Sequence, residues 1–220
     1  MREILWGLGF AVCHQLPTHS LFCGSEQIPW CARCTGLYWG ALISAITLLI
    51  LHPKGIARPP LVILTILCLG TLLLAVDALS DLFRLHASTN FTRLATGLWM
   101  GASLPPLLLA LLLKGGKLDE TKPFLRWDWL AATFVLAGLA LWFGLTTYDW
   151  SWWALAGGTA LGQIVLWGLC NLALAGLIIR RKASTKFRGA WMGILAATML
   201  LLELFLLGTV HIAMVMIAAS

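Results

Sequence analysis

Four of the six cysteines of this chain fall within one short segment, and this segment carries the most reactive side chains of the sequence. It contains Cys13-His14, then Cys23, and then a C-x2-C pair formed by Cys31 and Cys34. A C-x2-C pair with a more distant Cys and a His supplies three sulfurs and one nitrogen, a set that suits tetrahedral zinc. Intervening Pro and Gly residues would let the chain fold back on itself, so a metal site is one interpretation of the segment.

Two other interpretations of the same cysteines remain open. Four cysteines are an even number, and two disulfides on an oxidising face would tie down a loop that is otherwise long and polar. Alternatively, Cys31 and Cys34 would begin a helix whose dipole lowers a thiol pKa, which suits thiol–disulfide redox chemistry with a membrane quinone. The residues alone do not decide between metal, disulfide and redox chemistry.

A second group of polar residues lies further along the chain, near the ends of apolar stretches. Asp77 sits close to the end of one such stretch, where an ionised carboxylate needs a partner. We expect Arg93 or Arg33 to supply that partner. Asp77, Asn90, Arg93 and Arg33 then form either a substrate-binding group or a structural ion pair that closes the mouth of the bundle.

One more acidic residue lies within an apolar stretch. Glu203 falls near the middle of the last hydrophobic segment, and His211 follows two helical turns later. Because an isolated carboxylate there would be unfavourable, we expect Glu203 to be protonated or to have a partner inside the protein.

The elements that position these residues are expected to be membrane-spanning helices. The chain has 220 residues, of which 60% are hydrophobic and only 11% charged, against about 25% in soluble domains. Apolar stretches near the ~20 residues needed to cross a bilayer occur at 34–51, 61–79, 94–113, 129–147, 154–179 and 191–217. We therefore predict an all-α transmembrane bundle of six long spans in a single domain, residues 1–220. Residues 4–16 would add a short span or a re-entrant helix.

Pairs of glycines spaced four apart recur in these stretches. They are Gly36 with Gly40, Gly97 with Gly101, and Gly158 with Gly162. Small residues at this spacing allow two helix backbones to approach closely. We expect the pairs to serve helix contact and not chemistry.

Basic residues set the expected orientation. Eleven of the 15 Lys and Arg residues lie in the loops at 52–60, 114–128 and 180–190, which should face the cytoplasm with the N-terminus. The Cys/His-rich segment 13–34 and the connection 80–93 should then be extracytoplasmic. This concentration of charge at membrane borders argues against nucleic acid as a partner. Membrane lipid and other membrane subunits are the expected partners.

The sequence resembles a family of prokaryotic membrane proteins known as domain of unknown function 2085. The resemblance is carried by Cys13-His14-Gln15, by PWCARCTG at residues 29–36, and by Asn90, Arg93, Thr96 and Gly97; His19 and Cys23 fall outside the pattern. It implies a prokaryotic cell-membrane protein in which Cys13, His14, Cys31 and Cys34 recur. Three thiols cannot all pair as disulfides, so this set favours a metal ion, zinc, with the three sulfurs converging outside the bilayer.

Three functions are compatible with this expectation. A metal-containing bundle could act on a lipid, with Asp77, Asn90, Arg93 and Arg33 binding the head group. It could instead be an accessory subunit braced by metal or disulfides within a larger complex. A quinone-coupled thiol oxidoreductase is the third possibility.

The orientation can be tested at the 180–190 loop. In a variant without the native cysteines, Ser184→Cys should react with a membrane-impermeant maleimide only after the cells are opened, because its basic loop is expected to be cytoplasmic. Modification of this cysteine in intact cells would contradict the orientation.

Overall fold

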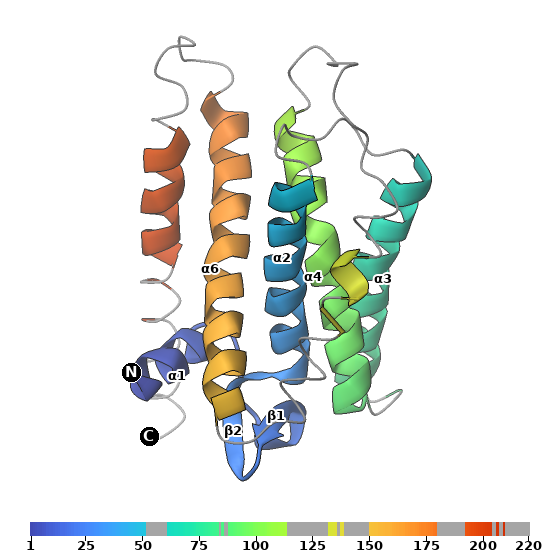
Figure 1. The fold of residues 1–220 in the computed structure, drawn as a ribbon, viewed down its shortest axis with the longest axis vertical. Coiled ribbons are helices and arrows are strands. Elements are labelled where there is room, and N and C mark those ends of the chain that lie inside the picture. The colour runs from blue at the N-terminus through green and yellow to red at the C-terminus, as the bar shows by residue number, and fades with distance from the viewer. Residues whose placement is uncertain are drawn as a thin grey trace.

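Four long helices lie side by side and form most of the protein (Figure 1). They are α2 (Ala32–Leu51), α3 (Leu61–Leu82), α4 (Asn90–Leu113) and α6 (Trp150–Ile179). The computed structural model describes residues 1–51, 61–83, 85, 88–113, 132–135, 137–138, 150–179, 192–203, 206 and 209. Within these ranges the chain is mostly helical, as predicted. A further apolar helix, Met192–Glu203, packs beside α6 in the view of Figure 1.

The N-terminal part departs from the all-α prediction. The short helix α1 (Arg2–Phe10) and the 3-10 turn η1 (Pro17–His19) precede strands β1 (Ser20–Cys23) and β2 (Glu26–Cys31), which pair antiparallel as a hairpin. Gly24 has a φ of 62° in the two-residue turn between the strands. Such turns favour glycine because other residues rarely adopt positive φ. A hairpin this short has too few periodic residues to stand out among the apolar stretches.

The prediction of six long membrane spans is not supported. Among the described residues, three helices are long and apolar enough to cross a membrane: Ala32–Leu51, Leu61–Asp81 and Trp152–Ile178. Helix α4 has 24 residues, but it begins with a polar turn and contains Pro105 and Pro106. The stretch 129–147 lies mostly outside the described residues. The stretch 191–217 is described mainly as the shorter helix Met192–Glu203.

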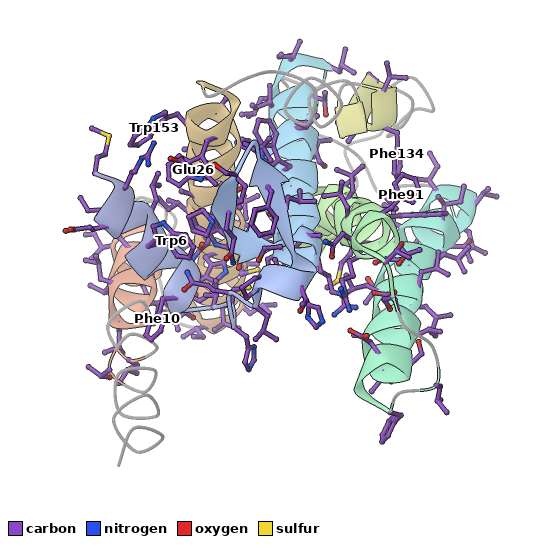
Figure 2. All side chains as sticks on the ribbon, turned by 90° about the horizontal axis from the view of Figure 1, so that it is seen from below. Trp6, Phe10, Glu26, Phe91, Phe134 and Trp153 are labelled. Carbon is purple, nitrogen blue, oxygen red and sulfur yellow. The ribbon has the colours of Figure 1, made fainter. Side chains whose placement is uncertain are left out.

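Residues 4–16 do not form a membrane span. Helix α1 has only nine residues, about 13 Å at 1.5 Å per residue, and it contacts β2 and α6. Arg2 forms an ion pair with Glu26 at the hairpin turn, with 2.8 Å between Nη1 and Oε1, and lies over the rings of Trp152 and Trp153. Figure 2 shows Glu26 and Trp153 at this end of the molecule, near α1. The N-terminus and the Cys-rich segment therefore lie at the same end of the protein, which differs from their expected placement on opposite faces. Which side of the membrane this end faces stays a prediction.

The helix directions otherwise agree with the expected alternation. Helix α2 starts at the hairpin, and the ends of α2, α4 and α6 lie with the start of α3 at the opposite end (Figure 1). The loops expected to be cytoplasmic, 52–60, 114–128 and 180–190, lie outside the described residues. The α3–α4 connection lies at the hairpin end, and it is shorter than the predicted 80–93 because α3 extends to Leu82 and α4 begins at Asn90.

Helices α2 and α4 meet through two of the predicted glycine pairs. A Cβ atom on Gly101 would lie 2.0 Å from the carbonyl oxygen of Leu37, and one on Gly97 would lie 2.2 Å from that of Arg33. From the other side, a Cβ on Gly36 or Gly40 would lie 2.3 Å from a carbonyl oxygen of α4. No side chain fits at these distances, so the backbones of α2 and α4 are in direct contact.

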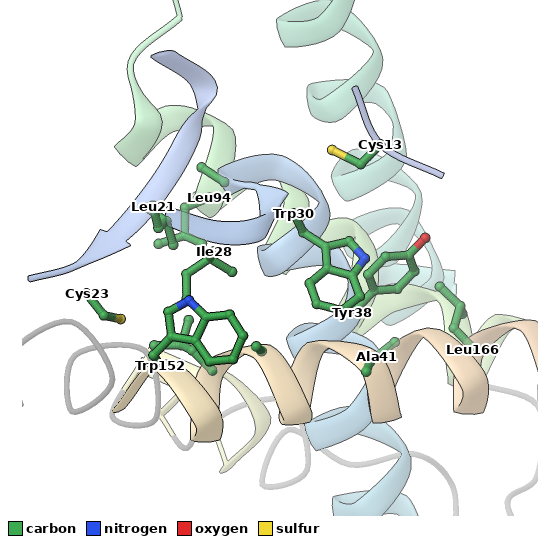
Figure 3. Packing of buried hydrophobic residues seen from close by; sticks show 14 residues of the cluster. Cys13, Leu21, Cys23, Ile28, Trp30, Tyr38, Ala41, Leu94, Trp152 and Leu166 are labelled. Atoms are coloured by element: carbon green, nitrogen blue, oxygen red, sulfur yellow. The ribbon is translucent and has the colours of Figure 1, made fainter. Parts of the chain in front are cut away.

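Helix α6 covers another side of α2 and the hairpin. A Cβ on Gly162 would lie 2.1 Å from the carbonyl oxygen of Tyr38, whereas one on Gly158 would lie 2.2 Å from the ring of Trp39. The third glycine pair therefore meets one backbone group and one side chain of α2. Trp30 of β2 donates its indole N–H to Oε1 of Gln163 at 3.0 Å, deep in the protein. Both side chains are buried, and Figure 3 shows Trp30 within the apolar cluster beside Tyr38. The hairpin is therefore part of the core and not a mobile extension of it.

The glycine contacts can be tested by adding one methyl group. Gly101→Ala should lower the stability of the detergent-purified protein by about 1–3 kcal/mol, because the new Cβ meets the Leu37 carbonyl group. Gly157→Ala on α6 is the matched control, since nothing lies within 4 Å of its Cβ position. Equal thermal unfolding temperatures for the two variants would contradict direct backbone contact.

Candidate metal centre

The three cysteines of interest come from a loop, a strand and a helix. Cys13 follows α1, Cys31 is the last residue of β2, and Cys34 lies in the first turn of α2. Strand β2 continues into α2 without a loop, so the C-x2-C pair spans the strand–helix junction. The return of the chain from α1 brings Cys13 to this junction.

The loop after Cys13 is held by glutamine side chains. Gln15, which has a positive φ of 52°, donates from its amide nitrogen to the carbonyl oxygens of Trp6 and Pro29, both at 2.9 Å. Gln27 donates to the carbonyl oxygen of Gln15 at 2.8 Å. These bonds fix the loop against β2, and they give Gln15 of the Cys13-His14-Gln15 motif a structural role that the sequence did not reveal.

The sulfur atoms of Cys13, Cys31 and Cys34 all lie within 4.8 Å of one another. All three are free thiols, so the disulfide interpretation does not hold for them. Two backbone amides point at the sulfurs: the N–H of Cys31 donates to Sγ of Cys13 at 3.2 Å, and that of Cys34 to Sγ of Cys31 at 3.5 Å. Sulfurs bound to one zinc ion at about 2.3 Å would lie about 4 Å apart. The three cysteines could therefore hold a metal ion, as predicted.

The electrostatics of the cluster also favour a bound cation. Hydrogen bonds from the Cys31 and Cys34 thiols lower the pKa of Cys13 to about 3. The pKa of Cys31 is raised, first because its thiol donates to Cys13 and also because it is buried. A negative charge on Cys13 is thus stabilised, whereas a second negative charge on Cys31 is disfavoured. A metal ion would remove that opposition by binding several thiolates together.

The cluster opens into a pocket of about 370 Å³. Besides the cysteines, its lining includes His14, His19, Gln15 and Arg33. His14 is exposed and is not part of the sulfur group, so its role as a fourth ligand stays a prediction. His19 was set aside because it lies outside the family pattern, yet it faces the same pocket. Among the described residues, no fourth protein ligand is grouped with the three sulfurs, and the pocket leaves space beside them.

The predicted partner of Asp77 is confirmed as Arg33. Arg33 donates to Oδ2 of Asp77 from Nε at 3.0 Å and also from Nη2. Ser88 donates to the other carboxylate oxygen at 2.8 Å. Because Arg33 stands between Cys31 and Cys34, this ion pair connects α3 to the cysteine cluster.

Arg93 takes a different partner from the one expected. Its Nη2 donates to both carboxylate oxygens of Asp81, at 3.1 and 3.0 Å, and its side chain is only 6% exposed. Asn90 accepts from Arg93 at 3.3 Å and donates to the carbonyl oxygen of Ser20 in β1 at 3.1 Å. Asp81 lies four residues beyond Asp77, so both carboxylates are on one face of α3.

The two arginines and two aspartates form a neutral group at the hairpin end. Nη2 of Arg33 lies 3.7 Å from Asp81, so the two ion pairs are linked. Most of the polar atoms of Asp77, Asn90 and Arg93 are used within this network, which favours a structural role for these three. Arg33 alone among the four also lines the pocket beside the cysteines. Their role in substrate binding stays a prediction.

Comparisons with known proteins place this site within a family. Residues 13–105 match the family described as "Predicted membrane protein (DUF2085)". An uncharacterized protein of Methanothermobacter thermautotrophicus is 30% identical over 96 residues, which cover 44% of this chain and 83% of that relative. The chain belongs to this family. All three clustered cysteines, Arg33, Asp77 and Arg93 fall inside the DUF2085 segment, whereas α6 lies outside it.

A second relative covers a similar share of the chain. The uncharacterized protein MJ1492 of Methanocaldococcus jannaschii is 30% identical over 99 residues, or 44% of this chain. The chain spans 61% of the length of that relative. No solved structure matches the chain. The family therefore supports a membrane protein, and its name carries no activity.

The ion-pair network can be tested at Asp81. Asp81→Asn should destabilise the protein by about 3 kcal/mol, because it leaves the buried guanidinium of Arg93 without its counter-charge. The matched control is Glu26→Gln, which removes the exposed ion pair with Arg2 and should cost less than about 1 kcal/mol. The measurement is thermal or denaturant unfolding in detergent. Equal losses of stability in the two variants would contradict the conclusion that the Arg93–Asp81 ion pair is buried.

Proposed function

We propose that this DUF2085 protein is a zinc-dependent membrane enzyme that acts at the extracytoplasmic end of its helix bundle. The observation that carries the proposal is the group of three sulfurs within 4.8 Å of one another at the wall of an open pocket. Structural zinc sites normally have four protein ligands, whereas catalytic sites keep one position for water or substrate. Three cysteines beside a pocket match the second arrangement.

The donor atoms limit the choice of metal. Calcium and magnesium prefer oxygen ligands, and none of the three clustered donors is an oxygen. Thiolates select zinc and other thiophilic ions. Zinc is the best match, because it accepts three thiolates and a fourth exchangeable ligand in a tetrahedral arrangement.

The pocket lining indicates the kind of molecule that would react. A bound zinc ion would polarise a carbonyl or phosphoryl oxygen or activate a water molecule. His14, His19 and Arg33 line the pocket, and none of the lining residues that the structure describes is acidic. Arg33 is oriented by Asp77 and can present its remaining N–H groups to an anion. The pocket lies at one end of membrane-crossing helices, so a lipid with a polar head group is the substrate class that the site favours.

A second function has its own support. Only 17% of the membrane-crossing window of α3 is buried, against 56% for α2, and its exposed residues are mostly apolar. The Arg–Asp network also pairs charged side chains with one another that could otherwise bind a substrate. These observations favour an accessory subunit in which the metal braces the hairpin, and in that case the fourth ligand would be protein or fixed water.

The metal proposal is tested by metal analysis of the full chain purified in detergent. Wild-type protein should carry about one zinc ion per chain, and Cys31→Ser should lose it. Cys68→Ser and Cys170→Ser are matched controls, because both cysteines are exposed in apolar helices away from the cluster. Metal-free wild-type protein with a reversible disulfide among the three cysteines would instead support the thiol oxidoreductase.

Cobalt substitution separates the enzyme from the brace. In the enzyme, the fourth ligand exchanges, so the visible spectrum of the cobalt-substituted protein should change when azide or a phosphate monoester is added. A spectrum that no added ligand changes would indicate a closed, structural site and would reject the proposed enzyme.

A further inference from the structure

A second cluster of polar groups lies away from the metal centre, between α6 and the helix Met192–Glu203. Glu203 is the only Asp, Glu, Lys or Arg residue in these two helices. It lies eleven residues beyond Met192, about 16 Å along the helix axis, which is close to half of the ~30 Å hydrocarbon layer. The carboxyl group is therefore at membrane depth with no cation on either helix.

Asn171 of α6 meets this carboxyl group. Its side-chain nitrogen donates to Oε2 of Glu203 at 2.9 Å, and Asn171 itself is buried. Within the part of the chain that the structure describes, the Glu203 side chain makes no other hydrogen bond. The expectation that Glu203 has a partner inside the protein is thus confirmed, whereas His211 lies outside the described residues. An amide can orient a carboxylate, but it cannot neutralise the charge.

The carboxyl group faces a cavity of about 460 Å³. The described lining residues are Trp167, Cys170, Glu203 and Leu206. The walls are almost entirely apolar apart from the carboxyl group, and Trp167 offers an aromatic surface. Cavities of this size hold small organic molecules.

We propose that this cavity binds a lipophilic organic cation from the membrane. A carboxylate at membrane depth is unfavourable unless a proton or a positive charge accompanies it, and the two helices provide no cation. An ammonium or phosphonium ion with apolar substituents would supply that charge and fill the apolar walls. The face of Trp167 adds a cation–π contact. A neutral apolar molecule would fill the same space but would leave the carboxylate uncompensated.

The site is independent of the proposed zinc enzyme. It uses α6 and the following helix, which lie beyond the DUF2085 segment at residues 13–105. Loss of metal from the cysteine cluster and loss of cation binding can therefore be measured separately in one preparation.

The test is equilibrium binding of radiolabelled tetraphenylphosphonium to the full chain in detergent. Wild-type protein should bind about one cation per chain in a saturable manner, and Glu203→Gln should weaken binding at least tenfold. The neutral analogue triphenylphosphine oxide should compete at least tenfold less well than the cation. Glu26→Gln, which removes an exposed carboxylate at the hairpin, should leave the affinity unchanged.

A second variant keeps the test informative if Glu203→Gln folds poorly. Cys170→Phe retains the carboxylate and fills the cavity, so it should also weaken binding while gel filtration and metal content stay as in wild type. The proposal is overturned if wild-type protein shows no saturable binding, if the neutral analogue competes equally, or if Cys170→Phe binds as tightly as wild type.

Discussion

Direct backbone contact between α2 and α4 is the constraint on which the rest of this structure depends. Gly36, Gly40, Gly97 and Gly101 bring the helices so close that the carbonyl groups of each occupy the space where the other would carry a side chain. Lipid tails are as apolar as leucine, so association within a membrane relies on such close contact more than on burial. The carbonyl group against Gly97 belongs to Arg33, so the same contact fixes the start of α2, where Cys34 and the arginine are presented.

Neutralisation of charge is the second requirement at the hairpin end. Arg33 and Arg93 enter from α2 and α4, and both aspartates enter from α3. Each charge would be unfavourable alone at the edge of a membrane. Paired with one another, the four charges join α2, α3 and α4. Helix α3 is otherwise the least buried of the three described helices that are long and apolar enough to cross a membrane, and these ion pairs give it a defined rotation.

Much of this arrangement could be predicted from the sequence, for physical reasons that differ between residues. Glycine pairs and apolar stretches carry a strong periodic signal, so the contacts of Gly36, Gly97 and Gly162 were predicted. The convergence of Cys13, Cys31 and Cys34 followed from spacing and from the family resemblance. The hairpin was missed because its four- and six-residue strands have little periodicity. The partner of Arg93 was missed because Asp77 and Asp81 lie on the same face of α3. Which of them pairs with Arg93 depends on the axial position of α4 along α3.

The absence of a loop between β2 and α2 makes the cysteine cluster sensitive to the rotation of a helix. Cys31 and Cys13 move with the hairpin, whereas Cys34 moves with α2. A side chain roughly 5 Å from a helix axis shifts by about 2 Å when the helix turns by 20°. Such a rotation is enough to take one sulfur out of reach of an ion held by the other two. Any event in the membrane that turns α2 would therefore be transmitted to the coordination sphere, and occupancy of the cluster would in turn hold α2 at one angle.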